Sequence, residues 1–65
     1  MTDSARRILN VEDQEAIRYA KTRALLRGGF KVLEASSGSE GLECVEAFRP
    51  VLVICDVKLP DMPNN

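Results

Sequence analysis

The hydrophobic and polar residues of this chain follow two different periods. Short runs that favour β-structure at residues 7–11, 30–35 and 51–55 predict three strands. Between them, residues 14–27 and 38–48 repeat apolar side chains at helical spacing, which predicts two helices. The third strand run, VLVIC, is apolar throughout, as in a strand that is buried on both faces of a sheet.

The first predicted helix has apolar residues on one face and charges mostly elsewhere. Asp13 is placed to be its N-cap, and Gly28 with Gly29 ends it. Its charged residues, Arg18 and Lys21 among them, are expected to form a solvated face without a functional role.

The second predicted helix carries an explicit start signal. Ser37 and Glu40 have the spacing of a capping box, and Pro50 ends the helical pattern. Gly41 lies inside this helix, where glycine costs about 1 kcal/mol relative to alanine. Its presence predicts close packing against a neighbouring element.

The alternation of strands and helices, with short connections, predicts an α/β fold with a parallel sheet. In a doubly wound order 2-1-3, the strand at residues 51–55 is an edge. The segment that follows, KLPDMPNN, has two prolines and no β-patterned run, so no fourth strand is expected to cover it. An uncovered apolar edge favours self-association, and we expect antiparallel pairing of two copies across a two-fold axis.

Composition narrows the class of protein. A chain of 65 residues forms one domain at most, and its net charge of −1 leaves no electrostatic footprint for nucleic-acid binding. No apolar run approaches the roughly 18 residues that span a membrane, which predicts a cytoplasmic protein without a membrane partner. Cys44 and Cys55 occur without any histidine, which predicts two reduced packing thiols rather than a zinc or nucleophilic site.

Three acidic residues follow two strands that the predicted order makes neighbours. Glu12 and Asp13 end the first strand, and Asp56 ends the third. Open parallel sheets bind ligands at the carboxyl ends of their strands, so the three carboxylates are expected to converge. Like charges at close range call for a cation, and Mg²⁺ is suited to oxygen ligands. A carboxylate in such a site can also act as a nucleophile toward a phosphoryl group.

A family resemblance rests on three stretches of the chain: ILNVEDQEAIR, GGFKVLEASSGSEGLE and PVLVICDVKLPDM. Together they resemble the first half of a response-regulator receiver domain, the phosphoacceptor module of two-component signalling. The resemblance implies a truncated flavodoxin-like (CheY-like) βαβαβ fold, with residues 1–65 as a partial receiver domain.

The same resemblance implies roles for four residues. Asp56 would be the phosphoacceptor, Glu12 and Asp13 would position Mg²⁺ with it, and the backbone carbonyl of Lys58 would be a further metal ligand. A histidine kinase or phosphotransfer protein would donate the phosphoryl group to a module that is not itself an enzyme, beyond weak self-phosphorylation or dephosphorylation.

Two functions stay open at this point. The receiver family's switch uses a Ser or Thr on a fourth strand and a Lys and an aromatic on a fifth, and none of these lies within the 65 residues. The chain is therefore expected to be either a magnesium-dependent phosphoacceptor or a truncated, switch-incompetent receiver. The latter would act by association or as a decoy, or would be a fragment of a longer protein.

Overall fold

A computed structural model describes residues 6–56. Its elements are β1 (Arg7–Glu12), α1 (Glu15–Arg27), β2 (Lys31–Ala35), α2 (Gly38–Phe48) and β3 (Leu52–Asp56). Their order is the predicted one, and no boundary differs by more than one residue from the range expected from the sequence. Neither helix in the described part of the chain is long and apolar enough to span a membrane.

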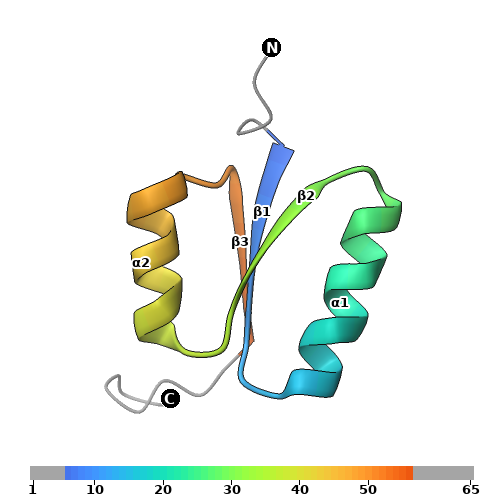
Figure 1. Cartoon of the computed structure of the whole chain (residues 1–65), viewed down its shortest axis with the longest axis horizontal. Helices are drawn as coiled ribbons and strands as arrows, with labels where there is room; N and C mark the ends of the chain where they lie inside the picture. The colour runs from blue at the N-terminus through green and yellow to red at the C-terminus, as the bar shows by residue number, and fades with distance from the viewer. Residues whose placement is uncertain (1–5, 57–65) are drawn as a thin grey trace.

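The three strands form one parallel sheet in the order β2-β1-β3, which confirms the predicted topology. Ile8 of β1 pairs with Val32 of β2 on one side and with Leu52 of β3 on the other. Figure 1 shows the sheet nearly edge-on, with α1 on one side and α2 on the other. Both helices contact β1 and β2, so the central strand is the most enclosed element.

The hydrophobic core is centred on β1 because, within residues 6–56, this is the one strand with a neighbour on each side and a helix over each face. Leu9 and Val11 are buried together with Ala35 of β2, and Leu33 and Cys44 pack against them. Cys44 therefore matches the predicted packing thiol. The matching expectation for the second cysteine is wrong, because Cys55 lies exposed on β3.

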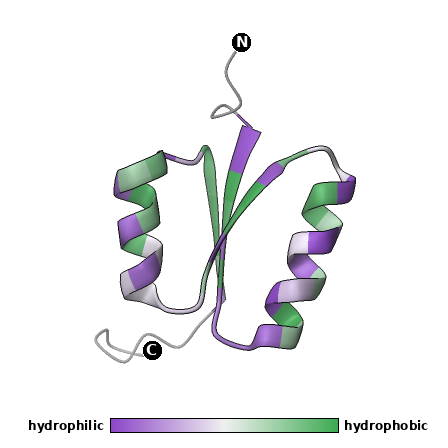
Figure 2. Cartoon of the chain, viewed as in Figure 1, coloured by the Kyte–Doolittle hydropathy of each residue, from purple (hydrophilic) through white to green (hydrophobic). Residues whose placement is uncertain are grey.

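The edge strand β3 is much less covered than its apolar sequence suggests. Leu52 is 52% exposed and Val53 is 43% exposed, so the interpretation of residues 51–55 as buried on both faces is wrong within residues 6–56. The cause is the strand order, which places β3 beside β1 while both helices lie mainly over β1 and β2. In Figure 2 most of β3 has the colour of hydrophobic residues.

The start of α1 differs from the prediction. Gln14 rather than Asp13 is the N-cap, and its side chain makes no capping hydrogen bond. The backbone N–H of Gln14 instead donates to Glu12 Oε2 at 3.1 Å. A buried carboxylate at the end of β1 thus accepts from the loop that leads into the helix. At the other end of α1, Gly29 has a φ of 89°, a conformation that glycine adopts without strain.

The start of α2 follows the prediction in one of its two capping bonds. Ser37 is the N-cap, and its hydroxyl accepts from the N–H of Glu40 at 3.2 Å. The Glu40 carboxylate returns to Ser36 instead of Ser37, accepting from its N–H at 2.8 Å and its hydroxyl at 3.0 Å. The predicted close packing of Gly41 is confirmed, since a Cβ there would lie 3.1 Å from Val11 Cγ2.

These contacts at Glu40 predict a pH-dependent contribution to stability. The backbone N–H of Ser36, followed by its hydroxyl, holds the pKa of Glu40 below its usual 4.5. A lowered pKa in the folded state means that the stabilisation is present above about pH 4.5 and is lost as the pH falls through the folded pKa. We expect Glu40→Gln to lower the melting temperature at neutral pH, and the gap to wild type to close on acidification.

Thermal melts of both proteins between neutral and acidic pH measure this gap. Glu43→Gln removes one charge from the same helix without removing a contact to Ser36, and so corrects for the change in net charge. A gap that stays constant or widens toward acidic pH would contradict the prediction.

Candidate functional site

Two of the predicted site residues lie side by side. Glu12 ends β1 and Asp56 ends β3, and the two are direct partners in the register of these parallel strands. Their surroundings differ sharply, because the Glu12 side chain is 2% exposed and the Asp56 side chain is 72% exposed. The edge of the sheet thus presents one buried carboxylate and one that faces solvent.

A lysine from α1 bridges these two carboxylates. Lys21 Nζ lies 3.2 Å from Glu12 Oε1 and 3.0 Å from Asp56 Oδ2. The hydrogen bond to Asp56, followed by that to Glu12, raises the pKa of Lys21 above its usual 10.5, so the side chain is an ammonium at neutral pH. One positive charge therefore contacts both acids directly.

The expectation that the charges of α1 form a solvated face is wrong for this residue, because its ammonium contacts two side chains of the sheet. Lys21 lies four residues after Ile17 and four before Leu25, so it shares the helix face that the apolar pattern assigns to the sheet. A charge on that face was the available sequence signal. It indicates a cation whose partner is on the sheet.

The buried Glu12 has a partner for each of its carboxylate oxygens. Lys21 Nζ contacts Oε1, and the Gln14 N–H donates to Oε2. Arg18, a second charge expected to be solvated, donates from Nη1 to the Glu12 backbone carbonyl at 2.9 Å. A buried carboxylate is tolerated when its charge is paired and its oxygens are hydrogen-bonded, and both conditions hold here.

A polar seam, formed by Asn10, Arg18, Thr22 and Glu34, joins α1 to the sheet. Asn10 is fully buried in the middle of β1, and its Nδ2 donates to the Arg18 carbonyl and to Thr22 Oγ1, both at 3.1 Å. Thr22 in turn donates to the Glu34 carboxylate on β2. No residue of α1 is buried, and these bonds join the middle of the helix to the sheet.

Sequence reasoning did not find the seam. The sequence signal for the seam is Asn10, a polar residue within an otherwise apolar strand run. A polar residue at a buried position needs hydrogen-bond partners, so Asn10 indicates polar contacts to a neighbouring element. The Oδ1 atom of Asn10 is buried without a hydrogen-bond partner in the described part of the chain.

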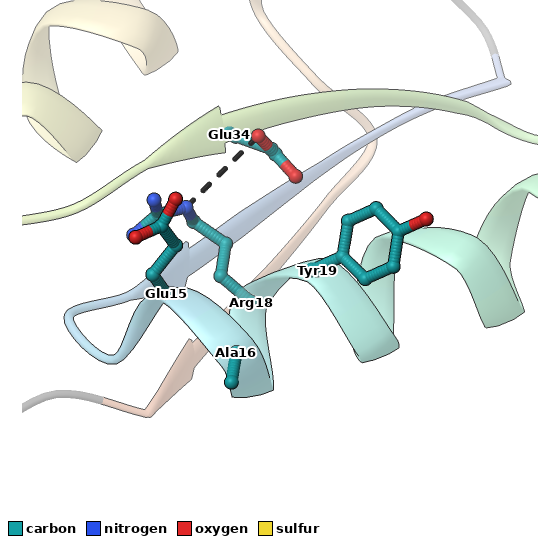
Figure 3. A pocket seen from close by; sticks show the side chains of 5 residues that line it. All are labelled: Glu15, Ala16, Arg18, Tyr19 and Glu34. Carbon is teal, nitrogen blue, oxygen red and sulfur yellow. Dashed lines mark ion pairs between the residues drawn. The ribbon is translucent and has the colours of Figure 1, made fainter.

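A shallow pocket lies between α1 and β2. Figure 3 shows Arg18 and Glu34 facing each other there, with an ion pair of 3.9 Å between Arg18 Nε and Glu34 Oε1. The lining residues are Glu15, Ala16, Arg18, Tyr19 and Glu34. Tyr19 is largely exposed. The pocket includes none of the predicted metal-binding acids.

The expected convergence of three carboxylates is only partly met. Asp13 is exposed, and residues 6–56 hold no group of three or more His, Cys, Asp or Glu side chains arranged for a metal ion. Lys58, whose carbonyl was predicted to be a ligand, lies outside the described residues. Glu12 and Asp56 alone still fit the chemistry of Mg²⁺, which takes one or two carboxylates and keeps several waters.

The fold and the acidic edge together define a CheY-like α/β protein. The model of the response regulator receiver domain family matches residues 8–63. The chain belongs to this family, and so it is a receiver domain of the kind found in two-component response regulators.

Curated relatives from three bacteria show the same similarity. The transcriptional regulatory protein AfsQ1 of Streptomyces coelicolor is 43% identical over 82% of this chain and 24% of its own length. The sensor kinase CckA of Brucella abortus is 42% identical over 85% of this chain and 6% of its own length. Sporulation initiation phosphotransferase F of Bacillus subtilis is 36% identical over 86% and 45%, respectively. The chain thus spans less than half of each of these relatives.

The polar seam predicts that Thr22→Val destabilises the protein. The substitution keeps the size of the side chain and removes the hydroxyl that joins Asn10 to Glu34. Loss of a partner for a buried amide costs about 1–3 kcal/mol in the free energy of unfolding. Urea denaturation measures the change.

Thr22→Ser is the matched control because it keeps the hydroxyl. We expect the free energy of unfolding of Thr22→Ser to stay closer to wild type than that of Thr22→Val. Serine, threonine and valine have similar helix propensities, so the hydroxyl is the main difference between the two variants. Equal stability of Thr22→Val and wild type would show that the seam does not hold α1 on the sheet.

Proposed function

We propose that this protein is a phosphoacceptor module of a two-component phosphorelay and is phosphorylated on Asp56 in a magnesium-dependent reaction. The observation that carries the proposal is the pairing of an exposed Asp56 with a buried Glu12 at the carboxyl ends of neighbouring strands. A nucleophile must be reachable by its donor, and the Asp56 carboxylate is the exposed member of the pair.

In the proposed reaction an Asp56 carboxylate oxygen attacks the phosphorus of a phosphohistidine donor. A P–O bond to Asp56 forms as the P–N bond breaks, and the electron pair of that bond stays on the departing imidazole nitrogen, which takes up a proton from water. Mg²⁺, when bound, supplies positive charge that lowers the repulsion between the carboxylates and the incoming phosphoryl group.

Four residues are proposed to hold the metal ion: Glu12, Asp13, Asp56 and, through its carbonyl, Lys58. The Gln14 N–H holds the carboxylate of the buried Glu12, and Arg18 holds its backbone carbonyl, so this residue is preorganised at the edge of the sheet. The exposed Asp13 follows it directly in the chain.

A histidine kinase or a phosphotransfer protein is the proposed donor. The relatives named above include a sensor kinase and a phosphotransferase, which supports this class of partner. A location in the cytoplasm, together with such partners, is part of the proposal.

Phosphorylation of Asp56 can be tested directly by intact mass spectrometry. The protein is incubated with Mg²⁺ and acetyl phosphate, and the expected result is a mass gain of one phosphoryl group. Asp56→Asn should abolish the gain because an amide is a poor nucleophile. Asp61→Asn makes the same chemical change elsewhere in the chain, and this variant should still show the mass gain. A gain that persists in Asp56→Asn would refute Asp56 as the acceptor.

A second candidate function is association through the edge of β3. Leu52 and Val53 are exposed, and within residues 6–56 β3 pairs only with β1. An exposed apolar edge is a template for another strand. We propose that two copies pair antiparallel through residues 51–55 across a two-fold axis, which would cover this edge.

Sedimentation equilibrium tests the association. We expect a monomer–dimer equilibrium that Val53→Lys shifts toward monomer, because a charge on an edge strand opposes pairing. Leu42→Lys places the same charge on an exposed apolar position of α2 and should leave the equilibrium unchanged. A protein that is monomeric at all concentrations would refute the dimer.

A further inference from the structure

Lys21 stands out among the side chains around the acidic edge. Within residues 6–56 it is the side chain that contacts both Glu12 and Asp56, and its ammonium lies between one oxygen of each. The Asp56 carboxylate accepts a hydrogen bond from Lys21 Nζ. The Glu12 carboxylate accepts one from Lys21 Nζ and another from the Gln14 N–H. The two acids therefore share one cation that the chain itself supplies.

We propose that Lys21 is an internal counter-cation that competes with a divalent cation for Glu12 and Asp56. The inference rests on the proposed function, because it assigns to Lys21 control over how tightly the same site binds Mg²⁺. Lys21 is a positioning and affinity-setting residue in this proposal, not a catalytic one.

Competition follows from the atoms that are engaged. A magnesium ion requires ligand oxygens at about 2.0–2.1 Å in near-octahedral geometry. Lys21 Nζ contacts Glu12 Oε1 at 3.2 Å and Asp56 Oδ2 at 3.0 Å, so the ammonium already lies between the two carboxylates that are proposed to hold the metal ion. An ammonium and a dication cannot occupy the same gap, and at this range they repel each other.

Displacement of the lysine is physically accessible. The Lys21 side chain is 30% exposed on a helix surface, and its four-carbon stem can turn the ammonium toward water. Glu12 is not left as an unpaired buried charge, because the incoming metal ion replaces the ammonium as its counter-ion. Lys21 and the metal ion are thus alternative partners of one carboxylate pair.

The test compares Mg²⁺ affinity by isothermal titration calorimetry in wild type, Lys21→Gln and Lys31→Gln. Lys31 begins β2, and the register places it opposite Arg7 at the far end of the sheet from Glu12. Lys31→Gln therefore makes the same change in net charge away from the site. We expect Lys21→Gln to bind Mg²⁺ about tenfold more tightly than wild type. Lys31→Gln should stay within about twofold of wild type, since distant exposed charges are screened by salt.

Two further measurements keep the test decisive if Lys21→Gln does not fold. Lys21→Arg retains the charge and should bind Mg²⁺ about as weakly as wild type. In wild type, Mg²⁺ should move the NMR signals of the Lys21 ε-methylene over the same concentration range as those of the Glu12 and Asp56 carboxyl groups. Unchanged Lys21 signals while the carboxyl signals shift would overturn the inference.

The remaining outcomes separate this inference from the proposed function. Equal Mg²⁺ affinity in wild type and Lys21→Gln, or no binding by either, overturns the competition. If wild type and Lys21→Gln bind Mg²⁺ equally tightly and Asp56 is still phosphorylated, the proposed function stands and the inference fails. If Lys21→Gln binds Mg²⁺ more tightly but Asp56 takes up no phosphate, the inference stands and the proposed function fails.

Discussion

The buried charge of Glu12 is the constraint on which the rest of this structure depends. Removing a carboxylate from water costs several kcal/mol unless its charge is paired and its oxygens are hydrogen-bonded. The partners that meet this requirement come from two places: Gln14 in the loop after β1 and Lys21 of α1. Lys21 also contacts Asp56 at the end of β3. Satisfying one buried acid therefore ties together the elements that form the site.

The attachment of α1 shows the same dependence on polar contacts. A surface helix usually docks through an apolar stripe, yet none of the side chains of α1 is buried. Asn10 and Thr22 join the helix to the sheet at its middle, and Arg18 joins it to the end of β1. Because hydrogen bonds are directional, this docking fixes the rotation of α1 and hence the position of Lys21.

The opposite face of the sheet is built by close packing. Gly41 allows α2 to approach Val11, and Cys44 of the same helix packs against the core. The core that results is small and centred on β1, which leaves β3 with apolar side chains in contact with water. Asp56 is exposed for the same reason, so the coverage that β3 lacks is also what makes its terminal carboxylate reachable.

Much of this molecule follows from the sequence by itself. The hydrophobic periods predicted the five elements, and the strand order they imply brought Glu12 and Asp56 to one edge of the sheet. The N-cap role of Ser37 was predictable because capping depends on residues within one helical turn. The close packing at Gly41 was predictable because a glycine inside a helix has no side chain to hold a neighbour away.

Only the tertiary structure decided which cation pairs with the two acids. Asp13 was the expected N-cap, but Gln14 takes that place and Glu12 accepts its N–H. Lys21 is nine residues from Glu12 and thirty-five residues from Asp56 in the sequence. Such a contact depends on how far α1 is rotated and where it lies over the sheet. Local periodicity identifies the face of a helix that meets a sheet, but the partner of a charge on that face is set by the geometry of packing.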